Sequence, residues 1–233
     1  MLFFDFNYWI FMLPALALML AAQFYVSSTY KKWSKVSNRS RLTGGEAAQR
    51  LIRAGNLDDV RVESVSGKLS DHYDPRHKVL RLSQGVYQTR SVAAVAIAAH
   101  ELGHAMQDQE GYLPLQIRSA MIPAVNIGST LGWIFIFLGI FLQWTGLAWV
   151  GVAVFSAGAL FSLATLPVEL NASARAKKLL VQTGIIVGQD EQKGVNKVLN
   201  AAALTYIAAL LTSVMQLLYF TSLVGGSMGG RRR

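Results

Sequence analysis

The longest stretch without a charge most restricts how this chain can fold. From Ser119 to Val168 there are 50 consecutive residues without Asp, Glu, Lys, Arg or His. As a helix rising about 1.5 Å per residue they would extend about 75 Å, enough to cross two bilayer cores of about 30 Å with a turn between them. We therefore expect a hairpin of transmembrane helices, 121–142 and 147–167, that turns at 143–146. A buried soluble hairpin is the alternative, but soluble helices of this length normally show a polar face.

Two further segments have the composition of membrane spans. Tyr8 to Val26 is apolar apart from Gln23, and Ala201 to Val224 is uncharged. The first segment differs from a signal peptide in its charge order, because Asp5 precedes it and the basic residues Lys31, Lys32 and Lys35 follow it. We expect this span to stay attached, with its N-terminus outside. Gly128 and Gly132 in the hairpin have the spacing that lets a neighbouring helix approach closely.

The basic residues indicate which side of the membrane the loops occupy. Residues 27–118 hold 14 of the 22 Lys and Arg, and residues 169–200 hold five. A hairpin places these two loops on the same side, which the positive-inside rule makes cytoplasmic. The three C-terminal arginines would then lie outside if the fourth span crosses fully, against the same rule; a partly re-entrant helix is the alternative.

Composition excludes several classes of protein. The 22 basic and 13 acidic residues give 22 − 13 = +9, and we attribute this surplus to topology and to anionic lipid headgroups. Nucleic-acid binding explains it less well, because no aromatic and basic stripe accompanies it. The chain has no cysteine, which rules out disulfides, thiol nucleophiles and Cys-type zinc sites. Any metal must be held by His, Asp or Glu.

The segment between the first and second spans has the patterning of a soluble region. Thr43 and Glu46 form a capping box that predicts a helix over 44–54, closed by Gly55. Valines around 60–65 and the apolar residues of 79–82 predict two strands, and the turn formers at 71–75 between them favour a hairpin. A further helix is predicted over 91–109 by its helical spacing of apolar residues.

That last helix carries an H-E-x-x-H motif, His100-Glu101-Leu102-Gly103-His104. Residues four apart project from one helix face, so His100 and His104 can hold one metal ion, with Glu101 beside the open coordination position. Two unrelated helix histidines with a solvated Glu101 are the alternative. It is the weaker one, because the surrounding helix is rich in alanine and reads as buried.

A catalytic zinc usually has three protein ligands and a water, so a third ligand is needed. Glu169 is the candidate. It directly follows the third span and is expected on the same side of the membrane as His100 and His104. An isolated carboxylate at the end of an apolar span is costly without a partner, which a metal ion would supply. The separation of 169 − 104 = 65 residues is the length that an inserted membrane hairpin would add. The alternative is that Glu169 merely begins a cytoplasmic helix, where an acid is favourable.

The motif resembles the gluzincin core of membrane endopeptidases related to the heat-shock protease and the CAAX-processing protease. A closer resemblance is to the bacterial and archaeal neutral zinc metallopeptidase family of the YugP type. It covers most of the chain and rests on 69–76, 78–83, 92–94 leading into His100-Glu101, 107–112 and 166–169. The resemblance implies a zinc peptidase. In that family we expect Asp where this chain has Asn171, an uncharged residue that can still accept a hydrogen bond.

The resulting hypothesis is zinc-activated hydrolysis of a peptide bond. Zn²⁺ would be held by His100, His104 and Glu169, and Glu101 would act as the general base. Asn171 or a backbone carbonyl could accept a hydrogen bond from a zinc-bound imidazole. The oxyanion could be stabilised by three residues of suitable chemistry, with turn packing or solvation as their alternatives: His72, Tyr73 and Arg175.

The strand at 78–83 could present its edge to an extended peptide substrate, or simply pack in a small sheet. Substrates would be peptides or proteins, membrane-associated ones among them; the lipid bilayer is a further partner and nucleic acid is not. One rival is a zinc-binding membrane scaffold or chaperone-like protein without turnover. Another is a channel or metal transporter, which would normally carry ionisable residues within its spans.

We thus predict a mainly α membrane protein of the cell membrane, multi-pass, with about four transmembrane helices and a small α+β zincin-like catalytic region facing the cytoplasm. The expected order is a transmembrane helix (1–27), a catalytic region (28–118), a transmembrane hairpin (119–168), a cytoplasmic helix with the third ligand (169–200), and a C-terminal transmembrane helix and tail (201–233).

Overall fold

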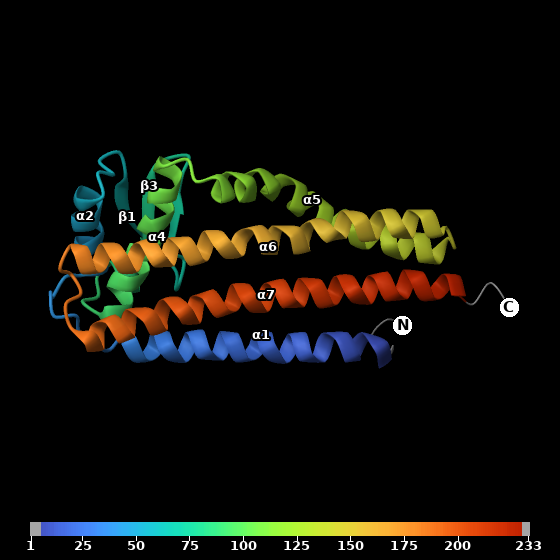
Figure 1. Cartoon of the computed structure of the whole chain (residues 1–233), viewed down its shortest axis with the longest axis horizontal. Helices are drawn as coiled ribbons and strands as arrows, with labels where there is room; N and C mark the ends of the chain where they lie inside the picture. Colours follow the sequence, from blue (N-terminus) through green and yellow to red (C-terminus); the bar gives the residue numbers. More distant parts are fainter. Residues whose placement is uncertain (1–5, 230–233) are drawn as a thin grey trace. The chain divides into compact units, whose positions relative to one another are not determined.

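The structure is a computed structural model that describes residues 6–229. Within this range the chain is mostly helical and has one small sheet (Figure 1). The predictions that involve Asp5 and the three C-terminal arginines lie outside the described residues. The elements are α1 (Phe6–Trp33), α2 (Gly44–Ala54), β1 (Arg61–Val65), β2 (His72–Asp74), β3 (Val79–Ser83), α3 (Gln84–Tyr87), α4 (Val92–Gln109), α5 (Leu113–Phe141), α6 (Thr145–Gln182) and α7 (Gln189–Gly229).

Four helices in the described range are long and apolar enough to cross a membrane: α1, α5, α6 and α7. This confirms the prediction of four such segments, although each helix is longer than its predicted span. Helix α6 in particular does not stop near residue 167 but runs through Pro167 to Gln182. It continues because Ala172, Ala176 and Leu180 lie on a face that is buried, and this burial outweighs the hydrogen bond that proline cannot make.

The described residues fall into two compact units. The helical unit comprises those among 1–22, 116–166 and 205–233, and the mixed unit comprises 23–115 and 167–204. In the helical unit, α5 and α6 approach closely at glycines. A Cβ added to Gly132 would lie 2.9 Å from the Phe155 side chain, and one added to Gly139 would lie 2.4 Å from the backbone of Ala148. The close approach predicted at Gly132 is therefore confirmed, with α6 as the neighbouring helix.

The sheet of the mixed unit has the order β1-β3-β2. Strand β1 pairs parallel with β3, and β2 pairs antiparallel with β3. The predicted strands around 61–65 and 79–82 exist, but the expectation of a hairpin between them is wrong. The connection forms β2 on the far side of β3, so the hairpin joins β2 to β3. Strand β3 is therefore central, and four of its five residues are buried, as expected for a strand covered on both faces.

Helix α2 is confirmed with its capping box. The Thr43 side chain accepts a hydrogen bond from the Glu46 backbone N–H, and the Glu46 carboxylate accepts one from the Thr43 backbone N–H. Helix α4 begins at Val92, where the Ser91 hydroxyl accepts a hydrogen bond from the Ala94 backbone N–H. The predicted helices at 44–54 and 91–109 thus lie where the sequence places them.

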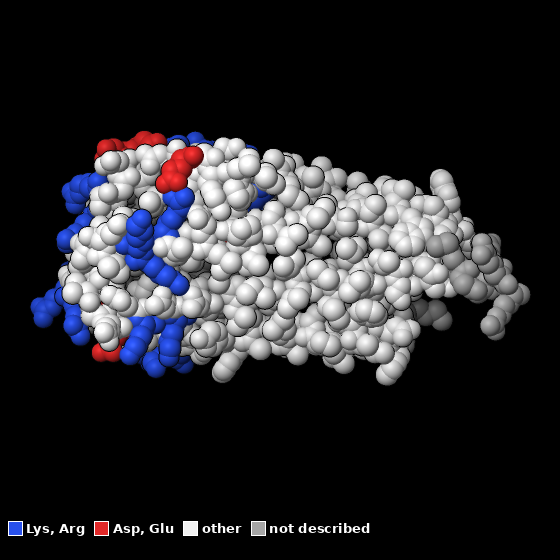
Figure 2. Space-filling model, in the orientation of Figure 1, with Lys and Arg blue, Asp and Glu red and all other residues white. Residues whose placement is uncertain are grey.

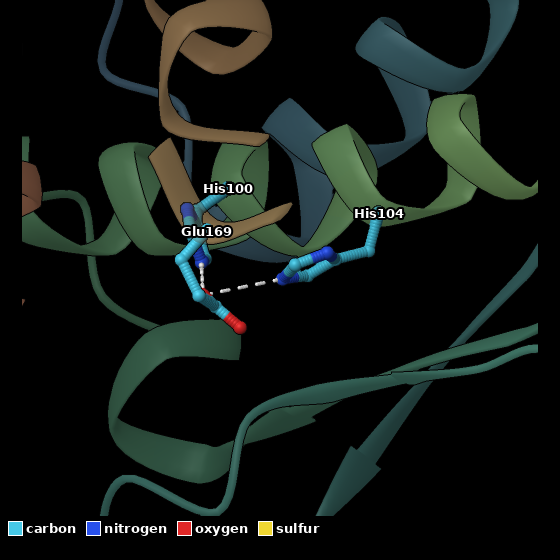
Figure 3. A group of neighbouring side chains, drawn as sticks. All are labelled: His100, His104 and Glu169. Carbon is cyan, nitrogen blue, oxygen red and sulfur yellow. Dashed lines mark hydrogen bonds and ion pairs between the residues drawn. The ribbon is translucent and has the colours of Figure 1, made fainter. Parts of the chain in front are cut away.

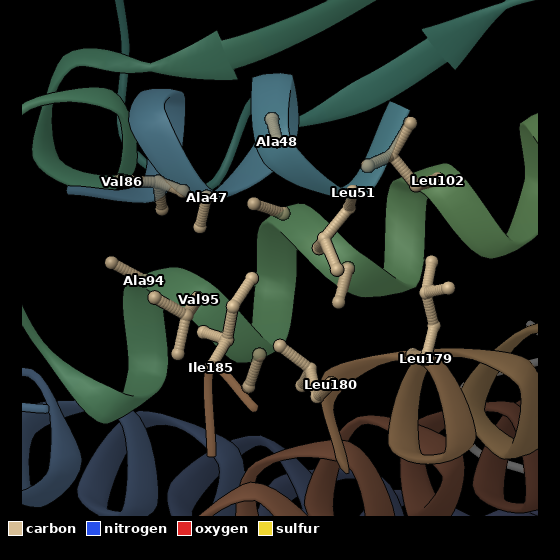
Figure 4. Packing of buried hydrophobic residues seen from close by; sticks show 14 of the residues in the cluster. Ala47, Ala48, Leu51, Val86, Ala94, Val95, Leu102, Leu179, Leu180 and Ile185 are labelled. Carbon is tan, nitrogen blue, oxygen red and sulfur yellow. The ribbon is translucent and has the colours of Figure 1, made fainter. Parts of the chain in front are cut away.

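The core of the mixed unit surrounds α4. Figure 4 shows α4 between α2 on one side and the last turns of α6 on the other. The packed side chains come from all of these elements: Ala47, Ala48, Leu51, Val86, Ala94, Val95, Leu102, Leu179, Leu180 and Ile185. Because α4 is covered on most sides, the positions of its polar residues are fixed by packing.

Charge is distributed unequally between the two units. Lys, Arg, Asp and Glu side chains are concentrated on the mixed unit, whereas the visible surface of the helical unit is uncharged (Figure 2). Among the described residues of the helical unit, Arg118 is the single charged residue. This is the distribution expected of a unit that lies in lipid and a unit that contacts water.

Candidate metal centre

The two histidines of the H-E-x-x-H motif lie one turn apart on the same face of α4. Their ring centroids are 4.9 Å apart and the ring planes stand at 82°. Each side chain is 12% exposed, so both rings are largely but not completely withdrawn from solvent. The rest of the helix is held by apolar contacts, which leaves the rings little freedom to move apart.

Helix α6 brings the third residue to this face of α4. Glu169 is 2% exposed, and its Oε2 lies 3.2 Å from His100 Nε2 and 3.6 Å from His104 Nε2 (Figure 3). Because Glu169 lies well inside α6, the alternative that it begins a helix is wrong. The close approach depends on Gly103, where an added Cβ would lie 2.5 Å from the carbonyl oxygen of Ala172.

The geometry of these three residues suits a metal ion. One donor atom from each residue lies within 4.8 Å of the others. Two ligand atoms bound at about 2.0–2.1 Å to a tetrahedral zinc lie roughly 3.3 Å apart. The distances of 3.2 Å and 3.6 Å from Glu169 to the two imidazoles are close to this separation. Two imidazole nitrogens and a carboxylate oxygen are also a ligand set that zinc commonly accepts.

The second nitrogen of each imidazole also has a partner. His104 Nδ1 lies 3.0 Å from Gln107 Oε1, and His100 Nδ1 lies 3.1 Å from Ser173 Oγ. Sequence reasoning missed both partners and suggested Asn171 or a backbone carbonyl instead. Asn171 Oδ1 accepts hydrogen bonds from Gln107 Nε2 and Arg175 Nε, so it contacts His104 only indirectly, through Gln107. Gln107 could have been noticed as a polar residue, three positions after His104, on a helix rich in alanine.

Burial and neighbouring charges change the pKa values of the ionisable groups in the motif. Burial raises the pKa of Glu101; the charges of His100 and His104 act in the opposite direction, and those of Glu169 and Asp71 add to the rise. Burial by itself lowers the pKa of His104, but the nearby carboxylates of Glu169 and Glu101 and the contact with Gln107 outweigh it and raise that pKa. A divalent ion beside these two carboxylates and two imidazoles would favour the ionised form of each carboxylate and the neutral form of each imidazole.

The three candidates for stabilising an oxyanion are engaged elsewhere. The Tyr73 hydroxyl donates to Asp108 Oδ2 over 2.9 Å, and Lys78 Nζ donates to the same oxygen. Arg175 forms a two-pronged ion pair with Glu110, and His72 Nδ1 lies 2.9 Å from the Ser70 carbonyl oxygen. An oxyanion role for any of them stays a prediction.

Of the two interpretations of the strand at 78–83, the exposed edge is wrong and packing within a small sheet is confirmed. Strand β3 is paired on both sides, so its backbone groups are used within the sheet. The edges belong to β1 and β2. Strand β2 is the one tied to the motif helix by a side-chain hydrogen bond, from Tyr73 to Asp108 on α4.

Four membrane-length helices and a buried group of two histidines and a glutamate define a class of protein, a multi-pass membrane protein with a candidate metal centre. Residues 8–225 match the family described as "Putative neutral zinc metallopeptidase", and the chain belongs to this family. It is 48% identical over 208 residues to a protein of Bacillus subtilis (strain 168) named "Putative membrane protease YugP", covering 89% of this chain and 92% of that protein. No solved structure matches the chain.

Proposed function

We propose that this protein is a membrane-embedded zinc metalloendopeptidase that hydrolyses peptide bonds near the cytoplasmic membrane face. The observation that carries the proposal is the convergence of His100, His104 and Glu169 from two helices. Membership of a family described as zinc metallopeptidases and a relative named as a membrane protease support it.

The residues have separate roles in this proposal. His100 and His104 would hold Zn²⁺ through Nε2, and Glu169 would hold it through Oε2. When bound, the ion would lower the pKa of a water toward about 7 and polarise the scissile carbonyl. Glu101 would accept a proton from that water as its oxygen attacks the carbonyl carbon, and would pass the proton to the leaving amine as the C–N bond breaks. Burial raises the pKa of Glu101, so this carboxylate accepts a proton more readily than an exposed one.

Charge and hydropathy support the proposed membrane location. The mixed unit carries nearly all charges of the described chain, and its loops hold the basic residues that the positive-inside rule assigns to the cytoplasm. Substrates would therefore be peptides or proteins that reach this face, including membrane-associated ones. An extended substrate strand would find a free edge at β2, beside α4.

Metal content and cleavage together test the proposal. The full chain, purified in detergent without added zinc, is expected to hold about one zinc ion and to cleave a fluorescently labelled unfolded protein such as casein. Glu169→Ala should lose both zinc and cleavage. Glu101→Gln should keep zinc and cleave about 10²–10⁴-fold more slowly, which is the usual contribution of a general base.

Glu63→Gln on strand β1 is the matched control, since Glu63 is an exposed acid whose partner is Arg81; it should change neither zinc nor cleavage. Wild-type protein without zinc would overturn the proposed site. Protein that holds zinc and whose cleavage is the same in Glu101→Gln as in wild type would exclude Glu101 as the base. Bound zinc with no cleavage would favour a scaffold or chaperone-like protein.

A further inference from the structure

A network of hydrogen bonds connects the surface of the mixed unit to His104. Arg175 pairs with Glu110 through two hydrogen bonds of 2.5 and 2.7 Å. Its Nε donates to Asn171 Oδ1 over 2.7 Å. Gln107 Nε2 donates to the same oxygen over 2.9 Å, and Gln107 Oε1 lies 3.0 Å from His104 Nδ1. We call Glu110, Arg175, Asn171 and Gln107 the outer network.

The direction of each bond in the outer network is fixed by groups that cannot change roles. A guanidinium only donates, so the atom of Asn171 that faces Arg175 must be its carbonyl oxygen. A backbone carbonyl only accepts, and Gln107 Nε2 lies 2.8 Å from the carbonyl oxygen of Val168. Gln107 therefore turns its amide nitrogen toward Val168 and Asn171 and its carbonyl oxygen toward His104.

This direction decides which nitrogen of His104 carries a proton. Gln107 Oε1 can only accept, so His104 Nδ1 must donate. Glu169 Oε2 is 3.6 Å from Nε2, too far for a hydrogen bond, whereas Gln107 Oε1 is 3.0 Å from Nδ1; the lone pair of the neutral ring therefore lies on Nε2. Gln107 is completely buried. If its side-chain amide flipped and exchanged its oxygen and nitrogen, water could not replace the hydrogen bonds that it would lose.

We propose that the outer network holds His104 as the Nδ1–H tautomer and so keeps its Nε2 lone pair ready for the metal. Gln107 is the positioning residue in direct contact, and the Val168 carbonyl and Asn171, itself held by Arg175, together fix the orientation of its amide. The inference rests on the proposed zinc site. It assigns a role to Asn171 that needs an acceptor oxygen and no charge, which explains how this chain can carry Asn at this position.

The other ligand histidine has a different kind of partner. Ser173 Oγ lies 3.1 Å from His100 Nδ1, and a hydroxyl can either donate or accept. Ser173 therefore does not fix the tautomer of His100. The two histidines should respond differently to loss of their partners, which provides an internal comparison.

The test uses ¹⁵N-histidine spectra of the full chain in detergent. With only four histidines in the sequence, the signals can be assigned by replacing each in turn. Spectra are recorded with Zn²⁺ bound and, without metal, at a pH high enough for all four imidazoles to be neutral. Wild type is expected to show His104 protonated at Nδ1. Gln107→Leu should let the Nε2–H form appear in the metal-free protein and weaken zinc binding about 10–100-fold, as is usual for a lost outer partner.

Variants of nearby residues separate positioning from simple loss of structure. Gln109→Leu is the matched control, because Gln109 is two residues along the same helix and donates to Asn56 at the surface; it should leave tautomer and zinc affinity unchanged. Asn171→Asp keeps an acceptor oxygen and should behave as wild type, whereas Asn171→Leu, which leaves the Val168 carbonyl as the remaining acceptor of the Gln107 amide, should shift the tautomer in the same direction as Gln107→Leu but by less. If Gln107→Leu does not fold, the pair at position 171 gives the same comparison.

The outcomes distinguish this inference from the proposed function. An unchanged Nδ1–H tautomer in both Gln107→Leu and Asn171→Leu would overturn the role of the outer network and leave the zinc site standing. Wild-type protein that binds no zinc would overturn the proposed function, and the metal-free spectra would still report on the network. An Nε2–H tautomer in wild type would contradict the inference directly.

Discussion

Gly103 of α4 and Ala172 of α6 lie backbone against backbone: a Cβ built on Gly103 would lie 2.5 Å from the carbonyl oxygen of Ala172. This glycine sits inside the H-E-x-x-H motif, between Glu101 and His104, and Ala172 is three residues after Glu169. The contact therefore sets the distance between the helix that carries the imidazoles and the helix that carries the carboxylate.

Gly103→Ala should destabilise the protein and weaken metal binding. An exposed helical Gly→Ala change normally stabilises by about 1 kcal/mol, but here the added methyl group must push two backbones apart, and overpacking typically costs about 1–3 kcal/mol. Thermal unfolding in detergent and competition for zinc by a chelator measure the two effects. The control is Gly158→Ala, since a Cβ there meets nothing within 4 Å. A Gly103→Ala protein with unchanged melting and zinc affinity would contradict this reading of the contact.

Asp71→Asn should change how stability depends on pH. Burial raises the pKa of Asp71, although the Ser83 backbone N–H and hydroxyl donate hydrogen bonds to it and act in the opposite direction. A carboxyl whose pKa is raised by folding favours the folded state most at low pH, and this contribution is lost as pH rises from about 4 through the raised value. Asn keeps an acceptor for Ser83 and does not titrate.

We therefore expect Asp71→Asn to melt at a higher temperature than wild type near neutral pH, with the difference shrinking as pH falls toward about 4. Asp71→Leu serves as the comparison, because it leaves the Ser83 N–H without its acceptor at a cost of about 1–3 kcal/mol. A difference between Asp71→Asn and wild type that stays constant from pH 4 to 7 would show that the charge at this position does not matter.

Single cysteines should report the proposed membrane topology, because the natural chain has none. Trp144 lies between α5 and α6 and is 62% exposed, whereas Val187 lies between α6 and α7 and is 69% exposed. A membrane-impermeant maleimide should label Trp144→Cys in intact cells, and Val187→Cys only after the membrane is permeabilised. The exposed Lys68 in the loop after β1 should behave, as Lys68→Cys, like Val187→Cys. Labelling of Lys68→Cys in intact cells would place the mixed unit outside.

Local patterns in the sequence were sufficient for much of this structure. The capping box at Thr43, the spacing of His100 and His104, and the uncharged stretches each depend on residues within a few turns of one another, so they could be interpreted without knowing the fold. Glu169 was found because a carboxylate beside an apolar span needs a partner. The family resemblance, which includes residues 166–169, supported the same residue.

Features that depend on distant contacts could not be predicted in the same way. The parallel pairing of β1 with β3 requires knowing that the connection crosses β3, although the four buried residues of β3 are typical of a central strand. The continuation of α6 through Pro167 depends on packing against α4. Gln107 and Ser173 became visible as imidazole partners only once α4 and α6 were placed together, because no local spacing pairs Gln107 with Val168.

The position of Glu169 late in the chain also bears on biogenesis. A ribosome that has made the sequence only as far as residue 168 has produced both imidazoles and the general base, yet not the carboxylate that completes the set. The whole uncharged stretch must therefore be synthesised before the cation site can close. In the proposed enzyme, hydrolytic competence would thus be postponed until the hairpin of α5 and α6 has been made.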